Sequence, residues 1–497
     1  MSSRLSKCLL IAAGLLLCGT NARAQSLEAA TAAYGKRDFA AAHRGFLALA
    51  RIGNGEAQYN LAVMLLNGEG VTRNVREGYA WLLCAQDYGI ADAEPLIAQI
   101  AAQVKPEVTA RARECVSMAG KAAALALVPR LPARDYWSNN HGPTRLGKPV
   151  SVFPDSAHSG DNIGWVEAEL TIDVDGRVKD VWIFDSYPTG QFDVYALDAI
   201  RGLKHTPAIV GGKAAPVMTR MRWKYGFKGF DARDIQGIGE TLKRLTQQAE
   251  AGAPTAQYVL YRLGDSFAEL RPGIDWLGFG RKALDGGFVA ARFQGGYCAV
   301  VGVGDCLITD RAAGLDMVRE AALTGTTTAQ VALGRLAFAE GTDDGYARAV
   351  RWLEAARTKD DPWAARYLAA ALLAFGDPAR RDAPRAIALL EPLLATPLMR
   401  DDPAVWQLAA VAYAQTGKPD LAVGAQEKAI VKAKRYDWPL EDLEVRRAAY
   451  AGGSRDFAGS VLVVSARVAP VAVDPSMRDG RVCHETPRGA TRITRCD

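Results

Sequence analysis

Cysteine is the residue type in this sequence whose number and spacing most directly suggest covalent chemistry. The 497-residue chain has eight cysteines, of which Cys8 and Cys18 lie in an N-terminal leader. The others are Cys84, Cys115, Cys298, Cys306, Cys483 and Cys496. An even number in an exported chain predicts disulfides; several pairings are open, and we expect neighbours to pair, as 84–115, 298–306 and 483–496. Zinc is the alternative, but no Cys-x-x-Cys pair occurs and His484 follows Cys483 directly, without metal-site spacing.

The residue types that commonly carry catalysis are not arranged for it. The five histidines are scattered, and no HExxH, Gly-x-Ser-x-Gly or Cys-His arrangement occurs. Residues 278–283 mimic the spacing of a dinucleotide fingerprint but lie within an expected helix pair, where the same spacing suits the core. Asp173, Asp175 and Asp180 surround a hairpin turn and would attract Ca²⁺, but turn aspartates more often cap the turn. We expect no enzyme activity, no metal and no cofactor.

The first 24 residues are typical of an export signal. A basic start is followed by an apolar run from Cys8 to Cys18, and small residues end the segment at Ala24. An apolar run of about eleven residues rises only ~16 Å as a helix, against ~30 Å for the bilayer core. We therefore expect cleavage between Ala24 and Gln25 and no permanent membrane span. An uncleaved anchor in the inner membrane is the alternative.

The balance of charge excludes one class of partner. The chain holds 60 Lys+Arg and 55 Asp+Glu, a net charge of +5. Arg4, Lys7 and Arg23 lie in the leader, where no acid occurs, so the rest of the chain is close to neutral. A protein that binds nucleic acid by neutralising phosphates needs a basic surface, so we expect no nucleic-acid partner.

Helical repeats lie on both sides of a different central block. Residues 57–93 place small and large apolar residues at helical spacing around a turn at 67–71, which predicts an αα-hairpin. Ala-Gln or Ala-Arg pairs followed by a large residue return at 256, 291, 329 and 365 and open further helix pairs. A period of roughly 35–40 residues predicts an α-solenoid, because one hairpin cannot bury its apolar face alone.

In the central block the apolar period changes from 3.6 to 2. The expected elements are strands at 165–172 and 178–184 around an Asp175-Gly176 turn, a helix at 192–200 that Asp193 caps, and a last strand at about 215–227. This order predicts a small antiparallel ββαβ sheet with one helix across its apolar face.

These regions resemble two known families. The Asn67–Val71 turn followed by a Trp-bearing helix resembles the Sel1-like repeat, a relative of the tetratricopeptide repeat, and residues 406–430 are closer to a tetratricopeptide repeat proper. The central block resembles the C-terminal domain of TonB, the energy transducer of the Gram-negative envelope. The matching elements, in order, are Phe153-Pro154, Gly160, Gly164-x-Val166, Asp175-Gly176-Arg177-Val178, Ser186, Phe192-Asp193-x-x-Ala196-Leu197, Pro207-Ala208, Gly212-Lys213 and Phe227.

The expected fold class is α+β multidomain, with an α-solenoid of Sel1/TPR-like helix pairs flanking a small TonB-like ββαβ domain. The expected divisions are a signal peptide at 1–24, N-terminal repeats at 25–125, a linker at 126–143, the TonB-like domain at 144–230, C-terminal repeats at 231–455 and a tail at 456–497. The tail is expected to be extended or disordered, with a disulfide hairpin closed by Cys483 and Cys496.

The TonB resemblance implies a docking site on the last strand. In that family the last strand is the sheet edge onto which a receptor peptide adds as a further strand. The residues expected to bind a partner here are Met218, Arg220, Arg222 and Lys224, on the face opposite to the apolar one. Their charge would favour an acidic peptide. The alternative explanation is that a basic stripe protects an edge strand from aggregation.

The expected function is that of a non-enzymatic periplasmic scaffold of a Gram-negative bacterium. It would bind envelope proteins, an outer-membrane receptor peptide included, by strand addition and through the solenoid groove; the alternative for the groove is that the repeats pack only against the central block. The competing function is a divergent TonB-family energy transducer for receptor-dependent transport, held in the inner membrane by an uncleaved N-terminal segment. Two observations argue against a transducer. Residues 8–18 contain no His or acid that could couple to a proton channel. Pro95 and Pro106 are the only prolines in residues 25–128, where a transducer has a Pro-rich arm. A weaker option is a regulator of an envelope enzyme.

Overall fold

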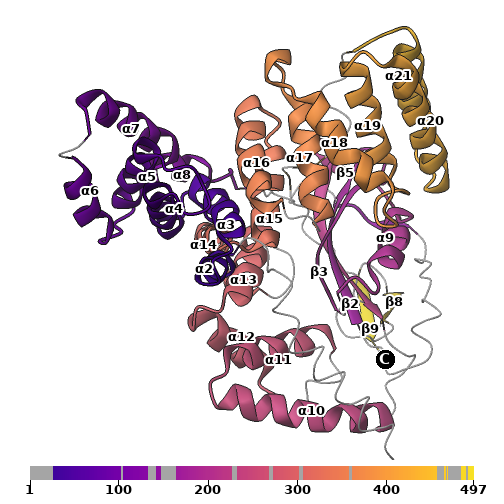
Figure 1. The fold of residues 1–497 in the computed structure, drawn as a ribbon. Helices are drawn as coiled ribbons and strands as arrows, with labels where there is room; N and C mark the ends of the chain where they lie inside the picture. Colours follow the sequence, from indigo (N-terminus) through magenta and orange to yellow (C-terminus); the bar gives the residue numbers. More distant parts are fainter. Residues whose placement is uncertain are drawn as a thin grey trace, which may run out of the picture.

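A computed structural model shows two arrays of paired helices and a small sheet (Figure 1). It describes residues 26–496 apart from 102–103, 132–141, 147–163, 188, 226–231, 268–272, 302–305, 358–360, 456–463, 466, 468–482 and 489–490. The predicted export signal and the Phe153-Pro154, Gly160 and Phe227 elements lie outside the described residues. The predicted fold class, α+β with solenoid repeats, is confirmed.

The N-terminal array is a run of short helices that pair in sequence order. They are α2 (Leu27–Gly35), α3 (Phe39–Arg51), α4 (Gly55–Asn67), α5 (Val75–Asp87), α6 (Ala93–Ala101), α7 (Pro106–Ala119) and α8 (Lys121–Ala126). The predicted αα-hairpin is α4 and α5. Gly68 ends α4 in the left-handed region, at φ +75°, and the Asn74 side chain accepts a hydrogen bond from the Glu77 N–H to begin α5.

The C-terminal array continues the same pairing over a longer stretch. Its helices are α10 (Ala232–Glu250), α11 (Pro254–Ser266), α12 (Trp276–Asp285), α13 (Val289–Val301), α14 (Arg311–Leu323), α15 (Thr327–Phe338), α16 (Asp343–Ala356), α17 (Pro362–Ala374), the 3₁₀ turn η4 (Pro378–Arg380), α18 (Ala383–Leu394), α19 (Pro403–Gln415), α20 (Pro419–Arg435) and α21 (Glu441–Ala451). Small residues let paired helices approach closely: a Cβ on Gly296 of α13 would lie 2.6 Å from the carbonyl oxygen of Gly314 of α14.

The repeating Ala-Gln pair has a structural explanation. Gln58, Gln257 and Gln330 are buried, and each donates a side-chain hydrogen bond to the carbonyl oxygen of the next-to-last residue of the preceding helix. The acceptors are Ala50 at 3.0 Å, Ala249 at 3.0 Å and Ala322 at 2.9 Å. Carbonyl groups in a last helical turn lack helical partners, so this glutamine fixes how each helix pair joins the one before it.

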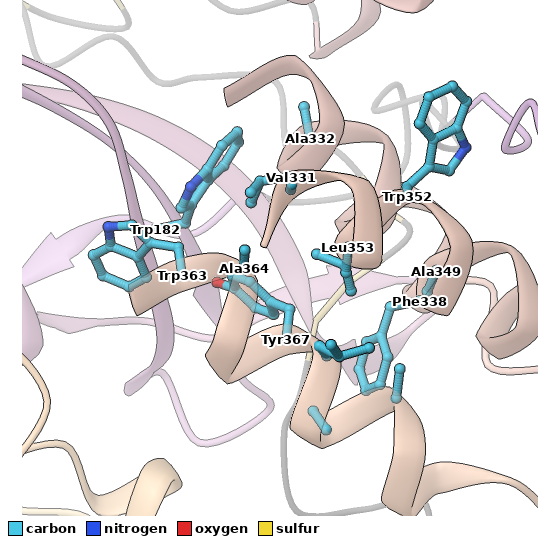
Figure 2. Close-up of a cluster of buried hydrophobic side chains, with 14 of the residues drawn as sticks. Trp182, Val331, Ala332, Phe338, Ala349, Trp352, Leu353, Trp363, Ala364 and Tyr367 are labelled. Atoms are coloured by element: carbon cyan, nitrogen blue, oxygen red, sulfur yellow. The ribbon is translucent and has the colours of Figure 1, made fainter. Parts of the chain in front are cut away.

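The two arrays pack against each other. Asn54 Nδ2 at the start of α4 donates to the Leu323 carbonyl at the end of α14, at 2.8 Å, and the Trp352 indole of α16 donates to the Leu127 carbonyl just after α8, at 2.9 Å. Figure 2 shows an apolar cluster that joins side chains of α15, α16 and α17, with Trp182 of the sheet beside Trp363 of α17.

The central block contains the predicted ββαβ elements. They are β1 (Arg145–Leu146), β2 (Gly164–Ile172), β3 (Val178–Tyr187), α9 (Asp193–Arg201), β4 (Lys204–His205), β5 (Ala208–Val210), β6 (Lys213–Ala215) and β7 (Val217–Tyr225). The three long strands form an antiparallel sheet in the order β3-β2-β7, and β1/β4 and β5/β6 are short additional pairs. Gly176 lies at φ +74°, where a Cβ would meet the His205 carbonyl oxygen at 1.9 Å, so the turn requires glycine.

Alternation along β2 gives the sheet two different faces. Val166, Ala168 and Leu170 face α9, whose apolar residues Ala196, Leu197 and Ile200 are buried in the same core. Asp193 does not cap α9, contrary to our expectation: Phe192 occupies the N-cap position without a side-chain cap, and Asp193 is the first helical residue.

The tail ends in a hairpin of β8 (Cys483–Arg488) and β9 (Thr491–Cys496), in which Cys483 lies directly opposite Cys496.

Candidate docking site at the sheet edge

Strand β7 forms one margin of the sheet. On one side it pairs with β2 along its whole length, from Gly164↔Tyr225 to Ile172↔Val217. Residues of an antiparallel strand point their backbone groups alternately to either side in the plane of the sheet. The Met218 N–H donates away from β2, to the Arg467 carbonyl at 2.7 Å, so the even-numbered residues of β7 direct their N–H and C=O groups to the outer edge.

The side chains of the same residues lie against the repeats. Met218 is 1% exposed, and the Arg220 guanidinium stacks on the rings of Phe184 and Tyr297. Arg222 pairs with Glu167. Arg220 and Arg222 therefore do not form a free basic stripe. Because their guanidinium groups are already engaged, their positions do not support a preference for acidic peptides. The side chain of Lys224 lies outside the described residues.

The sheet face opposite α9 carries acids, which meet arginines of the C-terminal repeats. At one end, Glu167 accepts from Arg222 Nε at 3.0 Å and pairs with Arg262 of α11 at 2.7 Å. Arg222 also donates to the Asp265 carbonyl at 2.7 Å. Burial raises the pKa of Glu167, but the guanidinium groups of Arg222 and Arg262 outweigh burial and hold that pKa well below its ordinary value.

A second set of ion pairs continues across the sheet. Arg335 of α15 pairs with Glu169 of β2 and, at 2.7 Å, with Asp180 of β3. Asp180 also pairs with Arg366 of α17 and accepts from the Tyr367 hydroxyl at 2.9 Å. Burial raises the pKa of Asp180, yet Arg366 and Arg335 outweigh burial, so the carboxyl remains ionised at neutral pH.

The network reaches the other side of the domain through Asp402, just before α19. Asp402 pairs with Arg366 at 3.2 Å and with Arg201 at the end of α9 at 2.9 Å. The loop after α20 adds a last contact: Asp437 pairs with Lys204 at 2.7 Å and Arg177 at 2.9 Å. The C-terminal repeats therefore pack against the chain's own sheet through α11, α15 and α17. This contact fits the alternative that the repeats pack against the central block, and partner binding through the repeats stays a prediction.

Buried ion pairs of this kind set geometry more than they add stability. Removing charges from water costs several kcal/mol per ion, which only good geometry and additional hydrogen bonds offset. Here each buried carboxylate has at least one guanidinium partner, so the sheet fits the repeats in one register. The arrangement holds the outer edge of β7 in a fixed position, and among the described residues the acids of the cluster are ion-paired to arginines.

Sequence reasoning missed these arginines. Arg262, Tyr297 and Arg335 each stand six residues after the repeat alanine, at 256, 291 and 329, between apolar neighbours. A charged or phenolic residue at this repeat position was the available signal. The partners of these residues on the sheet were not readable, because they lie up to 166 residues away.

The structure tests one of the three expected disulfides. Cys298 and Cys306 form a disulfide, as predicted. Cys84 is buried in α5, which packs against α7, the helix that contains Cys115; the side chain of Cys115 lies outside the described residues, so this pair stays a prediction. Cys483 and Cys496 are register partners in the β8–β9 hairpin. Their side chains lie outside the described residues, so this pair also stays a prediction.

The aspartates of the β2–β3 hairpin act as turn caps. Asp173 Oδ1 accepts from the Val174 N–H and Asp175 Oδ1 from the Arg177 N–H, both at 2.8 Å. Within the described ranges, no group of His, Cys, Asp and Glu side chains is arranged to hold a metal ion. Among the helices in the described part of the chain, none is both long enough and apolar enough to cross a bilayer.

Fold and site together define an α-helical repeat scaffold that holds a small sheet domain with one strand at its margin. Comparison with known families gives the same division. Residues 149–227 match the C-terminal domain of the Gram-negative bacterial TonB protein, and residues 55–85, 327–361 and 363–392 match the Sel1 repeat. The chain therefore combines a TonB C-terminal domain with Sel1 repeats on both sides, as its sequence predicted.

Similarity to solved structures is distant. A Sel1 repeat protein from Oxalobacter formigenes is 20% identical with a TM-score of 0.29; the match covers 46% of this chain and 61% of that protein. The c5321 protective antigen of uropathogenic Escherichia coli strains, which displays an SLR fold, is 16% identical with a TM-score of 0.24, over 86% of this chain and 85% of that protein. No curated protein matches the chain in sequence. The two matched families indicate a protein-interaction scaffold, a class of fold that is typically non-enzymatic.

Proposed function

We propose that this chain is an exported, periplasmic scaffold that binds envelope proteins by strand addition at the outer edge of β7. The partner is an extended segment of an envelope protein, an outer-membrane receptor included. The Sel1-like repeats hold the sheet in a fixed position. The proposal involves no catalysis and no cofactor.

The observation that carries the proposal is the state of the β7 edge. Both faces of the sheet are buried, one under α9 and the other against the C-terminal repeats, so neither face is free for a partner. Within the described residues, the outward backbone groups of Arg220 and Arg222 have no hydrogen-bond partner from another strand. Unpaired N–H and C=O groups in a row are a template for a further strand.

The repeats contribute a second surface to the proposal. Because α11, α15 and α17 already contact the sheet, a repeat-mediated contact is proposed for the N-terminal array, α2–α8. This array reaches the rest of the molecule through α14 and α16.

A pair of variants at one position tests strand addition. Arg222→Pro removes both the side chain and the outward N–H, whereas Arg222→Ala removes the same ion pairs and keeps the N–H. Envelope proteins cross-linked to the chain in intact cells are then identified by mass spectrometry. We expect a partner that is recovered with the alanine variant and lost with the proline variant. Equal recovery with both variants would rule out strand addition at this edge.

Export is tested separately by the mass of the mature protein. We expect an N-terminus at Gln25 and recovery in the periplasmic fraction. An intact N-terminus in the inner-membrane fraction would contradict the periplasmic scaffold and support the transducer alternative.

A further inference from the structure

The tail of the chain already occupies one end of the β7 edge. The Arg467 carbonyl accepts from the outward Met218 N–H at 2.7 Å, as an added strand would. The Ser465 hydroxyl donates to the Pro216 carbonyl at 2.8 Å, which is the outward acceptor two residues before Met218. Two consecutive outward positions of the edge are therefore paired with residues more than 240 positions away in the sequence.

The contact between Ser465 and the β7 edge is buried and has several hydrogen bonds. Ser465 is 4% exposed, its N–H donates to the Thr171 hydroxyl of β2 at 3.4 Å, and its hydroxyl accepts from the Arg467 N–H at 3.0 Å. Val464 packs against the main apolar core. The edge thus provides a place for a small hydroxyl residue preceded by an apolar one, and Arg467 contributes its carbonyl and its N–H to this contact.

The surrounding sequence has the composition of a strand. Residues 461–468 read VLVVSARV, which is rich in β-branched residues and free of proline. A segment of this kind is what an exposed strand edge pairs with most readily.

We propose that Val464, Ser465 and Arg467 form an internal stand-in for the docking partner, and that an extended segment with an apolar residue followed by Ser or Thr displaces it. This inference rests on the proposed docking function and adds the chemistry of the partner to it. Serine and threonine place a hydroxyl where Ser465 donates to Pro216, and the preceding apolar side chain takes the position of Val464. The internal segment lowers the apparent affinity of any partner, because only the fraction of molecules with an open edge can bind it.

The test uses the full mature chain and a peptide of its own sequence. Ser465→Pro removes the hydroxyl and the N–H of the internal segment, and Ser465→Ala, a milder change, removes the hydroxyl alone. The probe is a fluorescently labelled peptide of residues 461–468, and the same peptide with proline in place of serine is the control. Binding is followed by fluorescence anisotropy, and protection of the Met218 amide by hydrogen exchange.

In the wild-type protein we expect a protected Met218 amide and weak peptide binding. In Ser465→Pro we expect faster exchange at Met218, peptide binding at least about tenfold tighter than to the wild type, and protection restored by the peptide. Ser465→Ala should fall between the two, and the control peptide should not bind. Equal exchange at Met218 in all three proteins, or equal peptide affinity, would overturn the inference.

This result is separable from the proposed function. If the peptide protects the Met218 amide in Ser465→Pro but both Arg222 variants recover the same envelope proteins, the internal stand-in is supported and the docking function is wrong. If Met218 is unprotected in the wild type while Arg222→Pro still loses a partner, docking stands and the stand-in fails.

Discussion

Arg335 of α15 and Asp180 of β3 form a buried ion pair at 2.7 Å, although 155 residues separate them in the sequence. Both side chains are almost completely removed from solvent. The same guanidinium pairs with Glu169, so one repeat residue holds two strands of the sheet. This contact ties a helical repeat array and a small sheet together in one packed unit.

Replacing Arg335 is expected to destabilise the protein strongly. Arg335→Met keeps much of the apolar stem but leaves Glu169 and Asp180 with less compensation, and an uncompensated buried charge costs about 3–5 kcal/mol. The free energy of unfolding from urea titration at pH 7.5 measures this.

The matched control for that change is Arg292→Met. Arg292 of α13 pairs with Glu320 of α14, the other helix of the same pair, but both side chains are substantially exposed. An exposed ion pair contributes below about 1 kcal/mol, so the control should remain close to wild type. Similar losses in the two variants would show that burial of the Arg335 network has no special weight.

Asp193 is expected to make stability depend on pH in the opposite direction to the ion-paired acids. Burial raises its pKa to about 6, against about 3.9 in an unfolded chain. Because the native state holds this proton more tightly, its contribution to stability is complete below pH 4 and is lost as the pH rises to about 6. Asp193→Asn should therefore stabilise the protein by up to about 3 kcal/mol at pH 7.5 and change little at pH 4.

Urea unfolding of wild type and Asp193→Asn at both pH values checks this, since the difference between the two proteins isolates one carboxyl. The exposed Asp420→Asn on α20 is the control and should differ from wild type by less than about 0.5 kcal/mol at either pH. A constant difference between Asp193→Asn and wild type would contradict the prediction.

The repeat glutamine is expected to matter equally in different parts of the solenoid. Gln330→Met removes the donor to the Ala322 carbonyl without creating a large cavity, and the loss of a buried hydrogen bond should cost about 1–3 kcal/mol. Gln257→Met, which removes the equivalent bond to Ala249, should cost a similar amount. Gln247→Met, at an exposed site on α10, should be nearly neutral by thermal unfolding. A neutral Gln330→Met would mean that the side-chain bond does not couple the helix pairs.

The Cys298–Cys306 disulfide is expected to contribute about 2.5 kcal/mol, the chain-entropy value for a loop of this length. The two cysteines are eight positions apart and join the end of α13 to the segment before α14. The double variant Cys298→Ala/Cys306→Ala should lose this stability under oxidising conditions and match the wild type when both are measured in reductant. A loss that persists in reductant would assign the effect to packing instead of to the covalent link.

Much of the fold was predictable because its signals are local. The turn at Asp175-Gly176, the alternation of β2, β3 and β7 and the helix at α9 follow from patterns within a few residues. The Ala-Gln pairs marked the repeats before the contact of Gln58 with Ala50 explained why glutamine stands there. The capping role of Asp193 was wrong, because tertiary packing buries that carboxyl beside Ser186.

The sequence by itself determined the helical and strand elements and their order, because hydrophobic period and turn residues act between near neighbours. Only the tertiary structure selected Cys298–Cys306 from the open pairings, packed the repeats against the chain's own sheet and turned Arg220 and Arg222 inward. It alone placed Ser465 beside Pro216. The contacts of the sheet join segments far apart in the chain, and their energy depends on complementary charge and burial, which no local pattern records.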